Sequence, residues 1–165
     1  MSHASPEVAF HAGAGCAPTI DRTRLARDLA ALLAHFPRSV ARVDVELLGD
    51  EAMAAAHRRY MAIDGTTDVM SFPAHDERDP GAAVEADLMI STEVAAREAA
   101  ARGHAVEREI LLYAVHGTLH ACGYRDDTEE SFRAIHAEED RILTAGGLGP
   151  VYARETREER QDSRP

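Results

Sequence analysis

Two histidines and a following carboxylate are the residues whose types and spacing best fit a chemical role. His116 and His120 are four residues apart, Gly123 follows, and Asp126 stands six residues after His120. Residues four apart share one face of an α-helix, so both imidazoles can reach one cation at about 2.0–2.1 Å per Zn–N bond. Gly123 lets the helix end and reverse, which brings a carboxylate back toward that ion. The pattern predicts a metal site formed by His116, His120 and Asp126.

Other interpretations of this cluster remain open. A histidine pair at this spacing also occurs on helices that bind no metal, and Asp126 or Asp127 can instead cap the next helix. Asp127 as the third ligand, or no third ligand, are the alternatives. Aspartate is shorter than histidine, so direct ligation requires an inward loop or a bridging water. We favour Asp126, because two histidines and a carboxylate with an open fourth position form a known catalytic zinc arrangement.

The elements that must position this cluster follow the order strand, helix, strand, helix, strand, strand and three helices. Periodicity and capping residues predict strands over 8–11, 43–48, 67–73 and 86–90, and helices over 23–35, 51–60, 92–102, 105–122 and 128–146. Asp50 is the expected N-cap of the second helix, Ser91 or Thr92 caps the third, and Gly103 ends it. Two successive strands without an intervening helix argue against a purely parallel array. The order therefore predicts an α+β fold in which helices cover a small mixed sheet, with the histidines on the most apolar helix.

Length and composition indicate one globular domain over 1–150 and a charged, disordered tail over 151–165. The chain has 165 residues, 45% hydrophobic and 28% charged, with two cysteines and a net charge of −11. It lacks the run of about 20 apolar residues that a membrane span requires, and its opening lacks the pattern of a secretory signal, so we expect a cytoplasmic protein. The negative charge repels nucleic acid, so any RNA contact needs a local basic patch.

Three motifs, in order, resemble one known family. HGTLHACGYRDD from His116 resembles the signature His-Gly-x-Leu-His-x-x-Gly-Tyr-Asp-His of the YbeY family, the bacterial rRNA maturation endoribonucleases. TDVMSFP from Thr67 resembles its Thr-Asp-Val-Leu-Ser-Phe-Pro, and ADLMIS from Ala86 resembles its Gly-Asp-Ile-x-Ile-Ser. The resemblance implies a mixed sheet flanked by helices, a zinc ion bound by three histidines, and hydrolysis of single-stranded RNA during ribosome maturation. It also implies rRNA and the ribosomal particle as partners.

The chain departs from this family at three important positions. Asp126 replaces the third histidine, Arg125 replaces the aspartate before it, and Met61 after Tyr60 replaces an arginine. An anionic ligand lowers the net charge at the metal, which weakens acidification of its bound water and extends the choice of cation from zinc toward Mn²⁺ or Fe²⁺.

The chemistry expected of the site is attack of metal-bound water on a phosphodiester. Gly117 stands where helical zinc proteases carry their glutamate base, which disfavours peptide hydrolysis. Glu109, two helical turns before His116, is a candidate general base or a hydrogen-bond partner of a metal ligand. The alternative is that Glu109 is solvated or forms a salt bridge. Arg125 is the best candidate to stabilise the developing phosphorane.

The sequence also contains two basic residues that are candidates for RNA binding, and it is compatible with two other functions. Arg58 and Arg59 are candidate RNA contacts, each with a plain surface role as its alternative. Four other histidines are expected to be exposed: His57, His75, His104 and His136. Cys122 is expected to be buried. The rival functions are a ribosome-maturation binding protein that has lost catalysis, and a small metallohydrolase with a non-RNA substrate.

Overall fold

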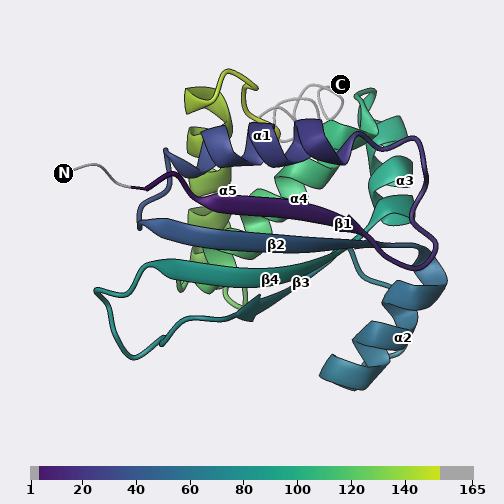
Figure 1. Ribbon diagram of the computed structural model, residues 1–165, viewed down its shortest axis with the longest axis horizontal. Coiled ribbons are helices and arrows are strands. Elements are labelled where there is room, and N and C mark those ends of the chain that lie inside the picture. Colours follow the sequence, from purple (N-terminus) through teal and green to yellow (C-terminus); the bar gives the residue numbers. More distant parts are fainter. Residues whose placement is uncertain (1–3, 153–165) are drawn as a thin grey trace, which may run out of the picture.

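The computed structural model describes residues 4–152 of the chain and has a four-stranded mixed sheet with helices packed on it (Figure 1). The elements are β1 (Glu7–Ala12), α1 (Arg22–Leu33), β2 (Val40–Leu48), α2 (Asp50–Met61), β3 (Val69–Pro73), β4 (Val84–Ser91), α3 (Thr92–Arg102), α4 (Val106–Ala121) and α5 (Glu129–Ala145). The strand order is β1-β2-β4-β3, with β3 antiparallel to β4 and the other neighbours parallel. The predicted α+β class and element order are confirmed.

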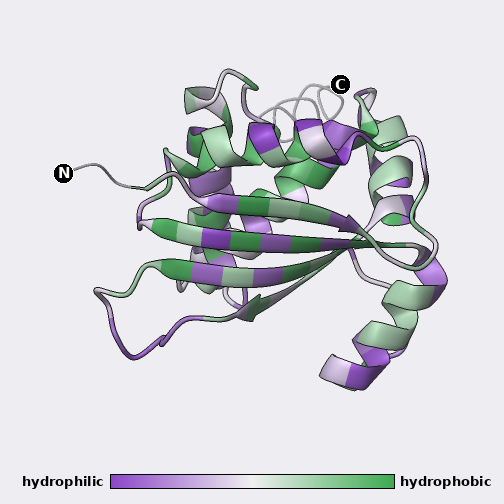
Figure 2. Cartoon of the chain, in the orientation of Figure 1, coloured by the Kyte–Doolittle hydropathy of each residue, from purple (hydrophilic) through white to green (hydrophobic). Residues whose placement is uncertain are grey.

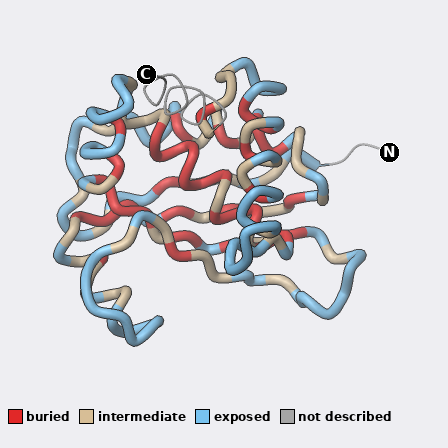
Figure 3. The backbone as a smooth tube through the Cα atoms, turned by 180° about the vertical axis from the view of Figure 1, so that it is seen from behind, coloured by how far each residue is buried: buried red, intermediate tan, exposed pale blue. Residues whose placement is uncertain are grey.

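The main core lies between the sheet and the helices α1, α3, α4 and α5. Alternate residues of the central strands face these helices, so the strands alternate in hydropathy along their length (Figure 2). On β2 the inward residues are Val43, Val45 and Leu47, all fully buried. Buried backbone is concentrated where α4 crosses the sheet (Figure 3). Helix α4 is therefore held on several sides, which makes it a rigid support for the histidines near its end.

Helix α2 lies on the other face of the sheet. It contributes Met53 to a second, smaller core with Leu48 and Met70. Gly49 is its N-cap, and Asp50, predicted as the cap, is instead its first helical residue. The Asp50 carboxylate accepts hydrogen bonds from Ser91 and from Arg97 at 2.6 Å, and the Arg97 guanidinium lowers the pKa of that carboxyl. Contacts to β4 and α3, distant in the sequence, have thus replaced the local capping interaction.

The chain ends are only partly described. Val151, at the start of the predicted tail, is buried, and Tyr152 is half-buried. Residues 153–165, the rest of that tail, lie outside the described residues. Between residues 4 and 152, no helix is long and apolar enough to cross a membrane.

Candidate metal centre

Gly117 allows the histidine-bearing part of α4 to lie close to the sheet. A Cβ at this position would stand 3.0 Å from Leu88 and 3.1 Å from Val69, and the Ser71 hydroxyl donates a 2.7 Å hydrogen bond to the Gly117 carbonyl. Both contacts seat the C-terminal half of α4 on β3 and β4. A glutamate here, as in a helical zinc protease after its first histidine, would press against Leu88 and Val69.

The structure brings the three predicted ligands together at the C-terminal end of α4. His116 Nε2 and His120 Nε2 are 2.9 Å apart, and one carboxylate oxygen of Asp126 lies 3.4 Å from the first and 3.3 Å from the second. Gly123, with φ of 104°, ends the helix and turns the chain back toward the histidines. Asp126 is exposed and His120 is partly exposed, so solvent reaches this cluster.

Hydrogen bonds on the far side of each ring determine which nitrogen faces the cluster. His120 Nδ1 lies 2.9 Å from the Tyr124 carbonyl, which only accepts, so Nδ1 donates and Nε2 of the neutral ring carries a lone pair. His116 Nδ1 likewise hydrogen-bonds the carboxylate of Glu139 on α5. Two lone pairs and one carboxylate oxygen therefore converge on the same point. When both rings are neutral, these three acceptors repel one another unless a cation lies among them.

The spacing of these acceptors also fits a cation. Ligand atoms about 2.0–2.2 Å from a tetrahedral zinc ion lie about 3.3–3.6 Å from one another. Two of the three measured distances, 3.3 and 3.4 Å, fall in this range, and the His116–His120 distance of 2.9 Å is a few tenths shorter. The donor set, two imidazoles and a carboxylate, is one that zinc, Mn²⁺ or Fe²⁺ accepts.

A second group, formed by His116, His136 and Glu139, is also close enough to suggest a metal. Its atoms, however, already pair as donors and acceptors: His136 Nδ1 lies 2.7 Å from one Glu139 oxygen, and His116 Nδ1 contacts the other. These distances are too short to place an ion between the atoms. Glu139 is thus an outer partner that orients His116, as carboxylates commonly do at histidine metal sites.

For both His116 and Glu139, burial and hydrogen bonding shift the pKa in opposite directions. Burial alone lowers the pKa of His116, but the hydrogen bond and charge of Glu139 outweigh it, so the pKa is raised. Burial alone raises the pKa of Glu139, and the hydrogen bonds from His116 and His136 outweigh that, so the pKa is lowered. Glu139 is therefore held as an anion in the core, where it favours donation from His116 Nδ1.

The charged neighbours of Asp126 pair with each other. Arg125 donates to Asp127 at 2.9 Å, and Asp127 also accepts from Ser131 in the first turn of α5. The Asp127 side chain is thus engaged with the helix start, whereas that of Asp126 faces both histidines. This arrangement favours Asp126 over Asp127 as the third ligand.

Glu109, predicted as a possible base, lies elsewhere in the structure. It is fully buried near the start of α4, where one carboxylate oxygen contacts Arg102 and the other lies 2.6 Å from His104 Nε2. Seven residues of helix, about 10 Å, separate it from His116. The salt-bridged role is the one observed, and Glu109 is not brought to the histidine cluster.

The basic residues proposed for RNA binding lie at the end of α2. Arg58 pairs with Asp64 at 2.9 Å with both side chains exposed, and the Arg59 guanidinium lies 5.4 Å from the centre of the Tyr60 ring. Met61, the next residue but one after Arg59, is also exposed, at 43%. It lines a hollow of about 400 Å³ that reaches His120.

Two hollows meet at His120 and differ in character. The first is largely apolar and is lined by Met61, Ile63, Val69 and Met70 among others. The second, of about 320 Å³, is lined by charged side chains that include Glu77, Arg125 and Asp126. The histidine cluster therefore lies between an apolar and a polar stretch of surface.

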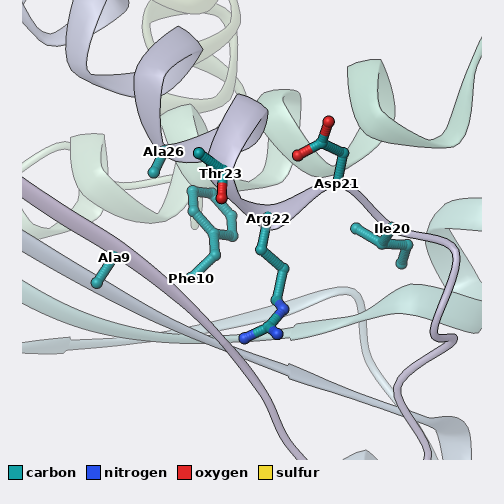
Figure 4. Close-up of a pocket in the computed structure, with 7 residues that line it drawn as sticks. All are labelled: Ala9, Phe10, Ile20, Asp21, Arg22, Thr23 and Ala26. Atoms are coloured by element: carbon teal, nitrogen blue, oxygen red, sulfur yellow. The ribbon is translucent and has the colours of Figure 1, made fainter.

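A larger hollow, of about 440 Å³, lies between β1 and the start of α1 (Figure 4). Its polar side chains include Asp21, which caps α1 by accepting from the Arg24 amide at 3.0 Å, and Arg22, which extends from the helix start toward the strands. Its lining includes no histidine, and its one carboxylate serves the helix. This hollow shows no arrangement for catalysis.

Several residues of the site were not identified from the sequence, or were placed wrongly. The prediction that four of the other histidines are exposed is wrong, since His57, His75, His104 and His136 are all partly buried. Cys122 is buried as predicted, and burial raises the pKa of its thiol to about 11. The one available signal for Glu139 was its position on the apolar face of the last helix, four residues after Ile135 and three before Ile142.

Together, the fold and site define a small α+β protein with a candidate metal centre on a histidine-bearing helix, which is open to solvent and lies next to a buried carboxylate. The family model described as Endoribonuclease YbeY matches residues 19–147. The chain belongs to the YbeY family.

Individual relatives agree with this assignment. Endoribonuclease YbeY of Mycobacterium ulcerans is 36% identical over 132 residues, which cover 75% of this chain and 73% of the relative. That of Thermus thermophilus is 37% identical over 121 residues, 73% of this chain and 87% of the relative. The solution structure of TM1509 from Thermotoga maritima has the same fold, with a TM-score of 0.50 and 17% identity over 84% of this chain and 90% of that one.

Proposed function

We propose that this protein is a metal-dependent endoribonuclease that cleaves single-stranded rRNA in the cytoplasm during ribosome maturation. The observation that carries the proposal is the convergence of His116 Nε2, His120 Nε2 and the Asp126 carboxylate at a solvent-accessible point. Membership of the YbeY family supports the reaction class and the substrate. Zinc is the proposed cation, with Mn²⁺ or Fe²⁺ as alternatives.

Different residues of the chain have different roles in the proposed reaction. A bound cation supplies Lewis-acid chemistry, which acidifies water and polarises a phosphoryl oxygen. Glu139 and the Tyr124 carbonyl hold both Nε2 atoms toward that cation. Arg125 is the proposed partner of the charge that develops on phosphate. Its pair with Asp127 is solvent-exposed and therefore weak, so a phosphate group can displace Asp127 at little cost.

The two hollows beside His120 suggest how an RNA strand lies in the site. The apolar hollow, with Met61 and Ile63, suits a base or ribose, and the charged hollow, with Arg125, suits the backbone. Arg58 and Arg59, exposed at the end of α2, are proposed to contact phosphates further along the strand. Such contacts would compensate locally for the net charge of −11.

The proposal is tested with protein purified in the absence of chelators. We expect about one zinc ion per chain, and cleavage of a single-stranded RNA that a chelator abolishes and added zinc restores. Bound metal without chelator-sensitive cleavage would instead support a ribosome-maturation binding protein, which the loss of the family arginine at Met61 favours. Cleavage that persists after complete metal removal would refute the proposed chemistry.

Introducing an arginine at Met61 should strengthen RNA cleavage. Met61→Arg places a cation in the hollow beside His120, where it can contact a phosphate, and we expect kcat/KM for single-stranded RNA to rise about three- to tenfold. The logarithm of the RNA-binding constant should also fall more steeply with the logarithm of salt concentration, by the amount expected for about one additional phosphate contact. The matched control is Met61→Gln, similar in length but neutral. An equal gain in both variants, or no gain with arginine, would contradict the argument.

A further inference from the structure

The last two residues that the structure describes are hydrogen-bonded to α5, near the candidate metal centre. The amides of Val151 and Tyr152 donate to one carboxylate oxygen of Asp140, at 2.8 and 3.0 Å. Val151 is 7% exposed and packs in the main core. Both residues lie beyond 147, where the match to the family model ends. This segment thus lies outside the family-matched region, and it has a defined place on the matched domain.

Tyr152 packs its ring on His136. The two rings are stacked, with centroids 4.6 Å apart and planes 11° from parallel, and Phe132 meets His136 edge-on with centroids 4.3 Å apart. Contact with two aromatic side chains restricts rotation of the imidazole. The position of the His136 ring is therefore set in part by the segment beyond 147.

His136 in turn positions the carboxylate behind the metal centre. Its Nδ1 lies 2.7 Å from one oxygen of Glu139, whose other oxygen contacts His116 Nδ1. His116 and His136 are also stacked on each other, with centroids 5.8 Å apart and planes 26° from parallel. A contact chain thus runs from Tyr152 through His136 and Glu139 to His116. Each step fixes the orientation of the next side chain.

We propose that Tyr152 is a positioning residue for the metal centre: by holding His136, it fixes the Glu139 carboxylate that directs His116 Nε2 toward the cation. This role rests on the proposed metal site. It assigns a function to a residue outside the family-matched region. Outer partners of this kind affect metal affinity because a ligand that must first be oriented binds with an added entropic cost.

The test measures zinc affinity of the full-length protein by competition with a chelator. Tyr152→Ala should weaken zinc binding about three- to tenfold, whereas Tyr152→Phe, which keeps the ring, should stay within about twofold of the original chain. Thermal unfolding of each metal-free variant shows whether it is folded. Unchanged affinity in Tyr152→Ala, or an equal loss in both variants, would overturn the role assigned to the ring.

A double-mutant cycle separates positioning from general destabilisation. In a Glu139→Gln background, the same Tyr152→Ala change should no longer alter zinc affinity, because the contact chain is already interrupted. Equal losses in both backgrounds would show that Tyr152 does not act through Glu139. If the original chain binds no zinc, the proposed function itself fails, and that result is distinct from failure of the Tyr152 proposal.

Discussion

Replacing Asp126 by alanine is expected to remove most zinc binding and RNA cleavage. The substitution deletes a carboxylate that lies within 3.4 Å of both His116 Nε2 and His120 Nε2. Loss of an outer partner alone costs about 10–100-fold in metal affinity, so loss of a direct ligand should cost on the order of 100-fold or more. The measurements are zinc content after gel filtration, affinity by chelator competition, and the rate of cleavage of single-stranded RNA.

The neighbouring aspartate provides the matched control. Asp127→Ala removes a carboxylate one residue away that pairs with Arg125 and Ser131 instead of the histidines. It should retain zinc affinity within about threefold, since it leaves all three proposed ligands in place. Asp126→His, which introduces the histidine implied by the family signature, should retain the metal. Full zinc content in Asp126→Ala, or a larger loss in Asp127→Ala, would refute the ligand assignment.

Replacing Glu139 by alanine is expected to affect both stability and metal binding. The change leaves Nδ1 of His116 and of His136 without their acceptor in the core, and an unpaired buried group of this kind costs about 2–4 kcal/mol. Zinc affinity should fall about 10–100-fold, because His116 is no longer held with Nε2 toward the site. Denaturant unfolding of the metal-free protein and chelator competition measure the two effects separately.

The adjacent glutamate distinguishes this effect from loss of a general helix contact. Glu138 contacts Arg141, whose side chain is half exposed, so Glu138→Ala should change the free energy of unfolding by about 1 kcal/mol or less and leave zinc affinity unaltered. Glu139→Gln keeps the size of the side chain and one acceptor oxygen. Its losses of stability and of zinc affinity should therefore lie between those of Glu138→Ala and Glu139→Ala. Equal behaviour of Glu138→Ala and Glu139→Ala would contradict the outer-partner role.

Local patterns were sufficient to predict the order and type of the elements. Alternation at Val43, Val45 and Leu47 predicted a strand because successive side chains face opposite sides of a sheet, and these three residues are fully buried. Ser91 and Gly103 bound α3 as predicted, since capping depends on neighbouring backbone groups. Where capping competed with distant groups, the prediction failed: Asp50 bonds Ser91 and Arg97 instead of capping its own helix.

The sequence by itself determined which residues face one another across a single helical turn. His116 and His120 were identified because helical geometry brings residues four apart together regardless of the remaining fold. Tertiary structure alone decided which ring nitrogen faces the cluster, and which aspartate points toward it. It also separated Glu109 from the site and brought Glu139, His136 and Tyr152 behind it. These arrangements depend on how α4, α5 and the segment after α5 pack, and no spacing along the chain encodes a contact between separate elements.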